Sequence, residues 1–162
     1  MAIRNIVFDD NPILLKPSKK VLEFDEKLWE LLDDMKETMD QNNGVGLAAI
    51  QVGVLKRVII VSINNLFLEM INPEIIKQSG NQCGVEGCLS IKNLQGYVNR
   101  PHQVTVKALD RFGNEYVLTA LNDVAVVLCH EIDHTNGILF TSKMVRPYLP
   151  EQEEVKTNKH LG

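Results

Sequence analysis

The chain of 162 residues is predicted to fold as a single α+β domain. Three observations predict this class. A helical pattern comes early, segments typical of antiparallel strands occupy the middle, and a second helical pattern carries two histidines. The domain is expected to span residues 1–145, with a polar tail at 146–162. Apolar residues make up 44% of the sequence, which is enough for a core without cross-links.

The first helix is expected from about Asp25 to Gln41. Its apolar residues recur with helical spacing on one face, which we interpret as core packing: Leu28, Leu31, Leu32, Met35 and Met39. Asn42 and Asn43 follow, and Gly44 suits a left-handed residue that ends the helix. Residues 3–8, ahead of this helix, predict a short strand or an extended arm.

The middle of the chain predicts strands. Val58–Ile63 is a β-branched run typical of a buried strand. Phe67–Asn72 and Glu74–Ser79 are expected as two strands on either side of Pro73. Cys83–Ser90 is rich in turn-forming residues and is expected to be a loop.

A hairpin and the second helix complete the domain. Alternating residues around 104–108 and 116–118 flank the turn signal Asp110–Asn114, which predicts the hairpin. The second helix is expected from Asn122 to about Asn136 and ends at Gly137.

Composition excludes several classes of protein. A net charge of −4 argues against nucleic acid or an anionic membrane as the main partner. No run of 18 apolar residues is present, so we expect no transmembrane helix. The first ten residues lack the pattern of a signal peptide, and three cysteines do not suggest a disulfide framework. We therefore expect a reducing, cytoplasmic location.

The stretch His130-Glu131-Ile132-Asp133-His134 lies on the second predicted helix. Residues four apart lie on one face of a helix, so His130 and His134 can hold one metal ion. Glu131 then lies beside the ion, where a general base is needed. The alternative interpretation is a polar helix face with two surface histidines.

A third ligand decides between a catalytic and a structural site. A histidine six residues after His134, found in one class of protease, is replaced by Phe140, which cannot bind a metal. A glutamate from the tail, as in thermolysin-like proteases, is a second option, and three are available: Glu151, Glu153 and Glu154. A cysteine from upstream, for which Cys88 is our candidate, is the third option.

The cysteines leave three interpretations open. Cys88 with the two histidines makes an open, catalytic site, whereas Cys83 and Cys88 together make a closed Cys2His2 structural site. In the closed site Glu131 has no function. Cys88 as a plain buried thiol is the third interpretation, and Cys129 is expected in the core.

Three stretches, in this order, resemble the signature motifs of the peptide deformylase family. They are residues 44–51 (GVGLAAIQ), 86–90 (EGCLS) and 130–134 (HEIDH). The resemblance extends over roughly residues 3–145. It implies antiparallel sheets around a central metal-binding helix, and hydrolytic removal of the formyl group from N-formylmethionine at the start of newly made proteins.

The resemblance also implies roles for individual residues. Cys88, His130 and His134 would bind one divalent metal, with ferrous iron expected natively and zinc, nickel or cobalt as alternatives. Glu131 would be the general acid/base, and the Gln51 amide and Leu89 backbone N–H would hold the oxyanion. Gly46 and Gly87 have no side chains, so a substrate backbone could lie against them as an added strand. Val45, Val126 and Val127 are expected either to line the methionine pocket or to be plain core residues.

The resemblance also implies what the protein binds. It implies nascent N-formylmethionyl peptides as substrates, met at the ribosome. Asp133 is expected either to pair with Arg100 or to be solvated. The sequence departs from the usual family residues, without changing a ligand, base or oxyanion donor, at Ile50, Lys92, Asn93, Asn122, Cys129 and Thr135.

Overall fold

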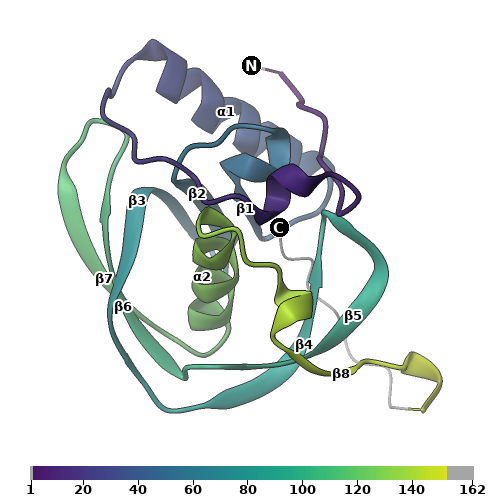
Figure 1. Cartoon of the computed structure of the whole chain (residues 1–162). Helices are drawn as coiled ribbons and strands as arrows, with labels where there is room; N and C mark the ends of the chain where they lie inside the picture. The colour runs from purple at the N-terminus through teal and green to yellow at the C-terminus, as the bar shows by residue number, and fades with distance from the viewer. Residues whose placement is uncertain (1, 153–162) are drawn as a thin grey trace.

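The computed structural model describes residues 2–152, which form two α-helices, eight strands and four short 3-10 helices (Figure 1). The α-helices are α1 (Glu26–Gln41) and α2 (Asn122–Thr135). The strands are β1 (Gly46–Ala48), β2 (Val58–Ile63), β3 (Leu66–Ser79), β4 (Gln82–Cys88), β5 (Ile91–Arg100), β6 (Gln103–Leu109), β7 (Glu115–Leu121) and β8 (Met144–Pro147). The 3-10 helices are η1 (Pro12–Leu15), η2 (Ala49–Val52), η3 (Phe140–Ser142) and η4 (Pro150–Gln152).

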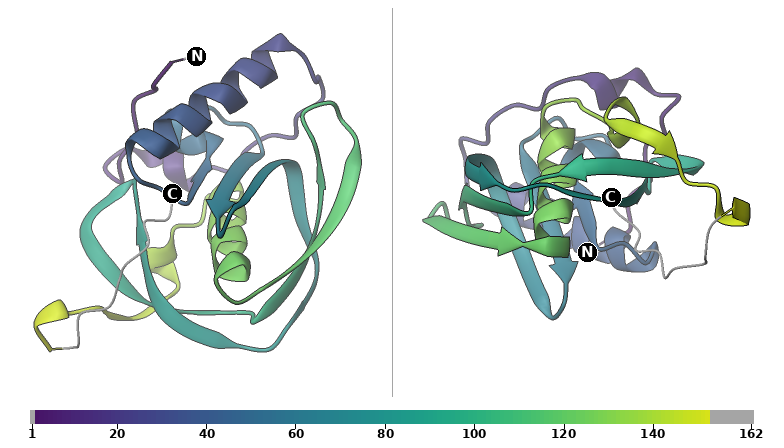
Figure 2. Two further views of the ribbon diagram at one scale, coloured as in Figure 1. Left: turned by 180° about the vertical axis from the view of Figure 1, so that it is seen from behind. Right: turned by 90° about the horizontal axis from the view of Figure 1, so that it is seen from below.

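The strands form two sheets that surround α2. One sheet has the order β1-β2-β3-β6-β7 and the other β4-β5-β8, and every pairing within them is antiparallel. Figures 1 and 2 show α2 enclosed by both sheets, while α1 lies against the outside of the larger one. The predicted α+β fold with a central helix is confirmed.

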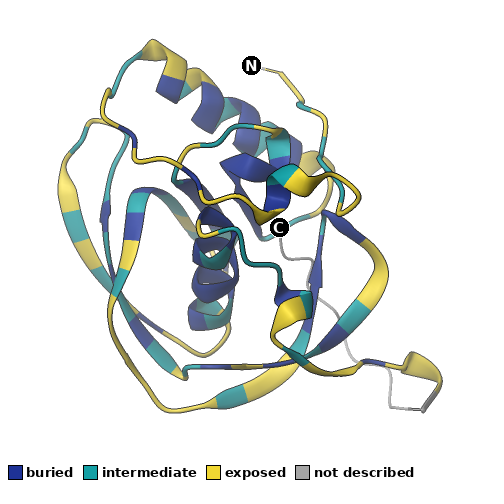
Figure 3. Ribbon diagram, viewed as in Figure 1, coloured by how far each residue is buried: buried dark blue, intermediate teal, exposed yellow. Residues whose placement is uncertain are grey.

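Burial explains this arrangement. Most of α2 is buried along its length (Figure 3), because it packs apolar side chains against the larger sheet. The predicted apolar face of α1 packs in a second cluster with β2 residues such as Val58 and Ile60. The Asp25 side chain accepts a hydrogen bond from the backbone N–H of Leu28 at 3.2 Å, which fixes the start of α1. Both predicted helices are confirmed to within one residue.

Strand β3 corrects the prediction of two strands around Pro73. The chain continues as one strand, and its pairing with β6 is irregular between Ile71 and Glu74. Proline has no N–H to give to a ladder, so it is tolerated at such an irregularity. Asn72 adopts a positive φ of 51°, and its side chain makes two hydrogen bonds to the backbone of Val21. A β-bulge therefore replaces the expected break.

Strand β4 corrects the prediction of a loop at 83–90. Residues 82–88 pair with β5, and only Leu89 and Ser90 form a turn between Cys88 and Ile91. Glycine and glutamate are poor strand formers, and the pairing that overrides this preference joins residues up to 18 positions apart. The left-handed residue after α1 is also not Gly44 but Asn43, whose φ is 56°.

The last strand includes part of the expected tail. Arg146 and Pro147 pair with β5, and the buried Tyr148 donates its N–H to the Gln95 carbonyl at 2.9 Å. Residues 153–162 of that tail lie outside the described residues. No helix in residues 2–152 is both long enough and apolar enough to cross a membrane.

Candidate metal centre

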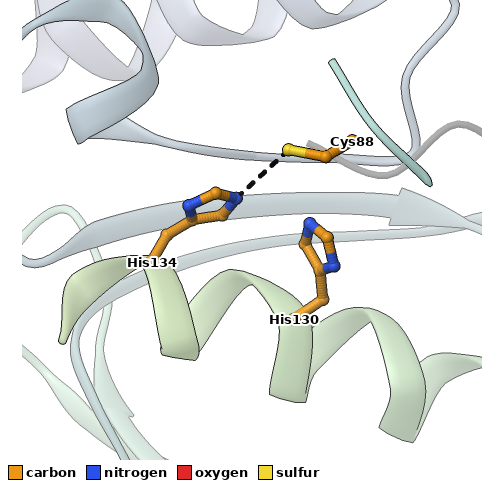
Figure 4. Close-up of side chains that lie close together, drawn as sticks. All are labelled: Cys88, His130 and His134. Atoms are coloured by element: carbon orange, nitrogen blue, oxygen red, sulfur yellow. Dashed lines mark hydrogen bonds between the residues drawn. The ribbon is translucent and has the colours of Figure 1, made fainter. Parts of the chain in front are cut away.

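Three potential metal ligands meet above α2. The ligand atoms of Cys88, His130 and His134 all lie within 4.8 Å of one another, and all three residues are buried. Figure 4 shows both imidazole rings rising from α2 toward the cysteine, with the Cys88 Sγ 3.5 Å from His134 Nε2. Sequence spacing placed the histidines together, and the fold adds the cysteine.

Cys88 reaches this position because β4 ends there. It is the last residue of the strand and pairs with Ile91 across the two-residue turn. Cys83 is exposed and lies five residues back along the same strand, roughly 16 Å at the usual rise per residue. The closed Cys2His2 site is therefore wrong. The predicted core position of Cys129 is confirmed.

A buried network of ion pairs and hydrogen bonds holds the His130 ring in place. The Nδ1–H of His130 donates to Glu86 Oε1 at 2.9 Å, which leaves Nε2 for a metal. Arg100 donates two hydrogen bonds to Glu86, each of 2.8 Å, and a third of 2.7 Å to Asp133. The expected pairing of Asp133 with Arg100 is confirmed.

Glu86 is the part of this network that sequence reasoning missed. Burial by itself would raise the pKa of its carboxyl, but the hydrogen bonds from Arg100 and His130 lower that pKa to about 2. The carboxylate is therefore charged and holds one tautomer and one orientation of the imidazole. Its place in the second motif, two residues before Cys88, was the available signal.

The environment of Cys88 suits a metal ligand. Burial and, to a smaller extent, the charge of Glu131 raise the pKa of the thiol to about 12, although N–H groups of Ser90 and Ile91 act in the opposite direction. A divalent cation would reverse this balance, because it stabilises a coordinating thiolate directly. A thiol and two imidazoles are also a donor set that iron and zinc accept. The residues present therefore fit one such ion.

Glu131 and Gln51 lie near these ligands on two different elements, α2 and η2. Glu131 is fully buried on α2, and β1 passes so close that a Cβ on Gly46 would lie 2.5 Å from Glu131 Oε2. Gln51 is held in η2, where its Oε1 accepts from the Ala48 N–H at 3.0 Å. Its Nε2 lies 3.6 Å from the Cys88 sulfur. Gly46 thus has a packing reason that the sequence did not show.

The remaining predicted residues lie next to Cys88 in the chain or in the core cluster around α2. Leu89 follows Cys88 in the turn, and a Cβ on Gly87 would meet the Gln95 side chain at 3.2 Å. Val127 is buried in the core cluster of α2, while Val45 and Val126 are half-buried against it. Their part in substrate binding stays a prediction.

Of the three tail glutamates, the one among the described residues is not part of the metal centre. Glu151 is exposed in η4 and is not part of the ligand cluster, while Glu153 and Glu154 lie outside the described residues. Phe140 is buried, and its ring stacks on His130 with centroids 6.1 Å apart. One protease class has a third histidine at this position. Here the Phe140 ring instead gives the metal centre an apolar side.

A buried thiol, two imidazoles and an adjacent carboxylate define the class of metal-dependent hydrolases. A family profile described as polypeptide deformylase matches residues 3–148. The chain belongs to this family, whose enzymes remove the formyl group from N-formylmethionine, and the resemblance inferred from the sequence is confirmed.

Relatives and solved structures agree with this assignment. The chain is 49% identical to a peptide deformylase of Caldicellulosiruptor bescii over all of its own length and 96% of the relative's. It is 52% identical to one from Acetivibrio thermocellus, over 94% and 89% of the two chains. A peptide deformylase structure from Legionella pneumophila matches with a TM-score of 0.86 and 42% identity, over 88% and 86%. One from Thermotoga maritima matches with 0.87 and 33%, over 89% and 99%.

Proposed function

We propose that this chain hydrolyses the formyl amide of N-formylmethionyl peptides, releasing formate, with Glu131 as its proton carrier. The observation that carries this assignment is the meeting of the Cys88, His130 and His134 ligand atoms beside the buried Glu131. A divalent metal held by those three ligands would supply the Lewis acidity that activates water and polarises the formyl carbonyl.

Glu131 takes the proton that water loses as it attacks the formyl carbon. It then gives this proton to the methionine nitrogen, so the C–N bond breaks and a neutral amine leaves. The carbonyl oxygen gains negative charge in this step. The Gln51 amide and the Leu89 N–H are the donors we assign to it, and losing one such donor typically costs about 10²–10³ in rate.

The substrate backbone is proposed to bind as an added strand. β1 ends the five-stranded sheet, and among the described residues only β2 pairs with it. An extended peptide can therefore add to its other edge. Val45, Gly46, Val126 and Val127 are our candidates for the methionine pocket and its approach. Gly87 borders a cavity of about 320 Å³ beside Cys88.

Ferrous iron is the expected native metal, and zinc, nickel or cobalt are expected to replace it. Because nascent formylated chains are the substrate, we expect the protein to act in the cytoplasm and to meet its substrate at the ribosome. Anaerobic purification followed by metal analysis tests the choice of metal, since an iron–thiolate centre is sensitive to oxidation.

The variant Glu131→Gln tests the mechanism. It keeps the shape of the side chain but cannot take a proton, so formate release from a formyl-Met peptide should fall by at least about 10²-fold. Metal content should stay at the wild-type level, since Glu131 is not a ligand. Glu30→Gln, at an exposed position of α1, is the matched control and should be fully active. Full activity of Glu131→Gln would refute the assigned role.

A further inference from the structure

The Gln51 side chain is held from both ends of its amide. Its Oε1 accepts the Ala48 N–H at 3.0 Å, and its Nε2 donates to the Ser90 hydroxyl oxygen at 3.0 Å. A backbone N–H can only donate, so this contact fixes which end of the amide is oxygen. Gln51 and Ser90 are both fully buried, so no water competes for these bonds.

The two amide hydrogens therefore have different partners. One hydrogen is given to Ser90, and Nε2 lies 3.6 Å from the Cys88 sulfur on the side of the metal ligands. Ser90 thus occupies one hydrogen of Gln51 and leaves the other directed toward the centre.

The backbones of both residues are fixed by the same segment. The Val7 N–H donates to the Gln51 carbonyl at 2.7 Å, and the Asp9 N–H donates to the Ser90 carbonyl at 3.0 Å. Between these two contacts, the Phe8 ring lies under the Lys92 ammonium, 4.1 Å from its centroid. The N-terminal arm therefore sets the distance between Gln51 and Ser90, so the hydroxyl meets the amide without rearrangement.

We propose that Ser90 is a positioning residue that orients the Gln51 amide toward the oxygen of the formyl group. Its hydroxyl accepts a hydrogen bond from Gln51, and it acts on the reaction through that residue. The proposal rests on the proposed function of Gln51 as an oxyanion donor. A donor that is present but misaligned costs less than a donor that is absent, so we expect about a tenfold effect.

Kinetics of variants provide the first test. Ser90→Ala should lower kcat for a formyl-Met peptide about tenfold and change KM by less than twofold, while Ser90→Thr, which keeps the hydroxyl, should retain most of the rate. The exposed Ser79→Ala is the control and should match the wild type. In a double variant with Gln51→Ala, the combined loss should be smaller than the product of the single losses. Multiplying losses would overturn the proposal.

A readout that needs no turnover provides the second test. In the zinc-loaded, ¹⁵N-labelled protein, the two side-chain amide protons of Gln51 should shift and exchange faster with solvent in Ser90→Ala but not in Ser79→Ala. If Ser90→Ala does not fold, Ser90→Gly removes the same hydroxyl and should give the same changes. Unchanged amide signals and unchanged kcat would overturn the proposal. An inactive wild-type protein with the expected amide changes would instead refute the proposed function.

Discussion

At the scale of single residues, the buried Glu86 carboxylate decides how His130 presents its ring. Glu86 bonds both His130 and Arg100, although it is no ligand itself. Removing such a partner typically lowers metal affinity 10–100-fold, and we expect this of Glu86→Gln. Breaking a buried ion pair should also cost about 3 kcal/mol of unfolding free energy. Metal titration and urea unfolding check the two effects, and wild-type values in both would contradict this role.

The same residue predicts a pH dependence. The Glu86 pKa is about 2 in the folded protein and 4.5 ordinarily, so the unfolded chain binds this proton more readily. The stabilising contribution is therefore complete above pH 4.5 and is lost as the pH falls toward 2, by roughly 3 kcal/mol. In metal-free protein the unfolding free energy of Glu86→Gln should fall less over this window than that of the wild type. Parallel pH profiles would show that another group is responsible.

The two cysteines of β4 give a matched pair of variants. Cys88→Ser should lose bound metal and activity, because a serine hydroxyl does not replace a thiolate for iron or zinc. Cys83→Ser should keep both, because Cys83 is exposed and distant from the histidines. Metal content per chain and formate release measure the contrast. Loss of metal from Cys83→Ser would mean that Cys83 is a ligand, as in the closed structural site.

At the scale of elements, the close approach of β1 to α2 makes the position of the Glu131 carboxylate sensitive to one methyl group. In Gly46→Ala the new Cβ would lie 2.5 Å from Glu131 Oε2, the end of a side chain that can move. We therefore expect a folded protein with a displaced Glu131 and a kcat lower by about 10²-fold. Gly84→Ala, with no atom within 4 Å of its new Cβ, should behave as wild type. Steady-state kinetics and circular dichroism test both variants, and a wild-type kcat for Gly46→Ala would exclude the displacement.

Element boundaries were predictable where local patterns decide them. The helices follow apolar periodicity, and β2 follows its β-branched residues to the residue at each end. The bulge at Pro73 and strand β4 were not predictable in this way, because each depends on pairing with a strand distant in sequence. β4 matters most, since the strand delivers Glu86 and Cys88 to the histidines.

At the scale of the whole molecule, the metal centre joins the smaller sheet to the central helix. Cys88 belongs to β4, and both histidines belong to α2. A ligand that binds only the folded state adds about 2.7 kcal/mol of stability at 100 times its Kd. For a chain of this length, removing the metal with a chelator should lower Tm by about 5–10 °C. Calorimetry with and without chelator tests this, and re-addition of metal should restore Tm. An unchanged Tm would mean that the centre does not link the two elements.

The sequence by itself determined the fold class, the family resemblance and the pairing of His130 with His134, because these depend on local spacing and ordered motifs. Cys88 as the third ligand was implied by the resemblance alone. His130 and His134 lie one helical turn apart whatever surrounds them. Only the tertiary structure decided what surrounds the ligands. The partners of Glu86, the packing of Gly46 on Glu131 and the bond from Gln51 to Ser90 each join segments at least 14 residues apart. No local pattern encodes such contacts, because they arise when both sheets close around α2.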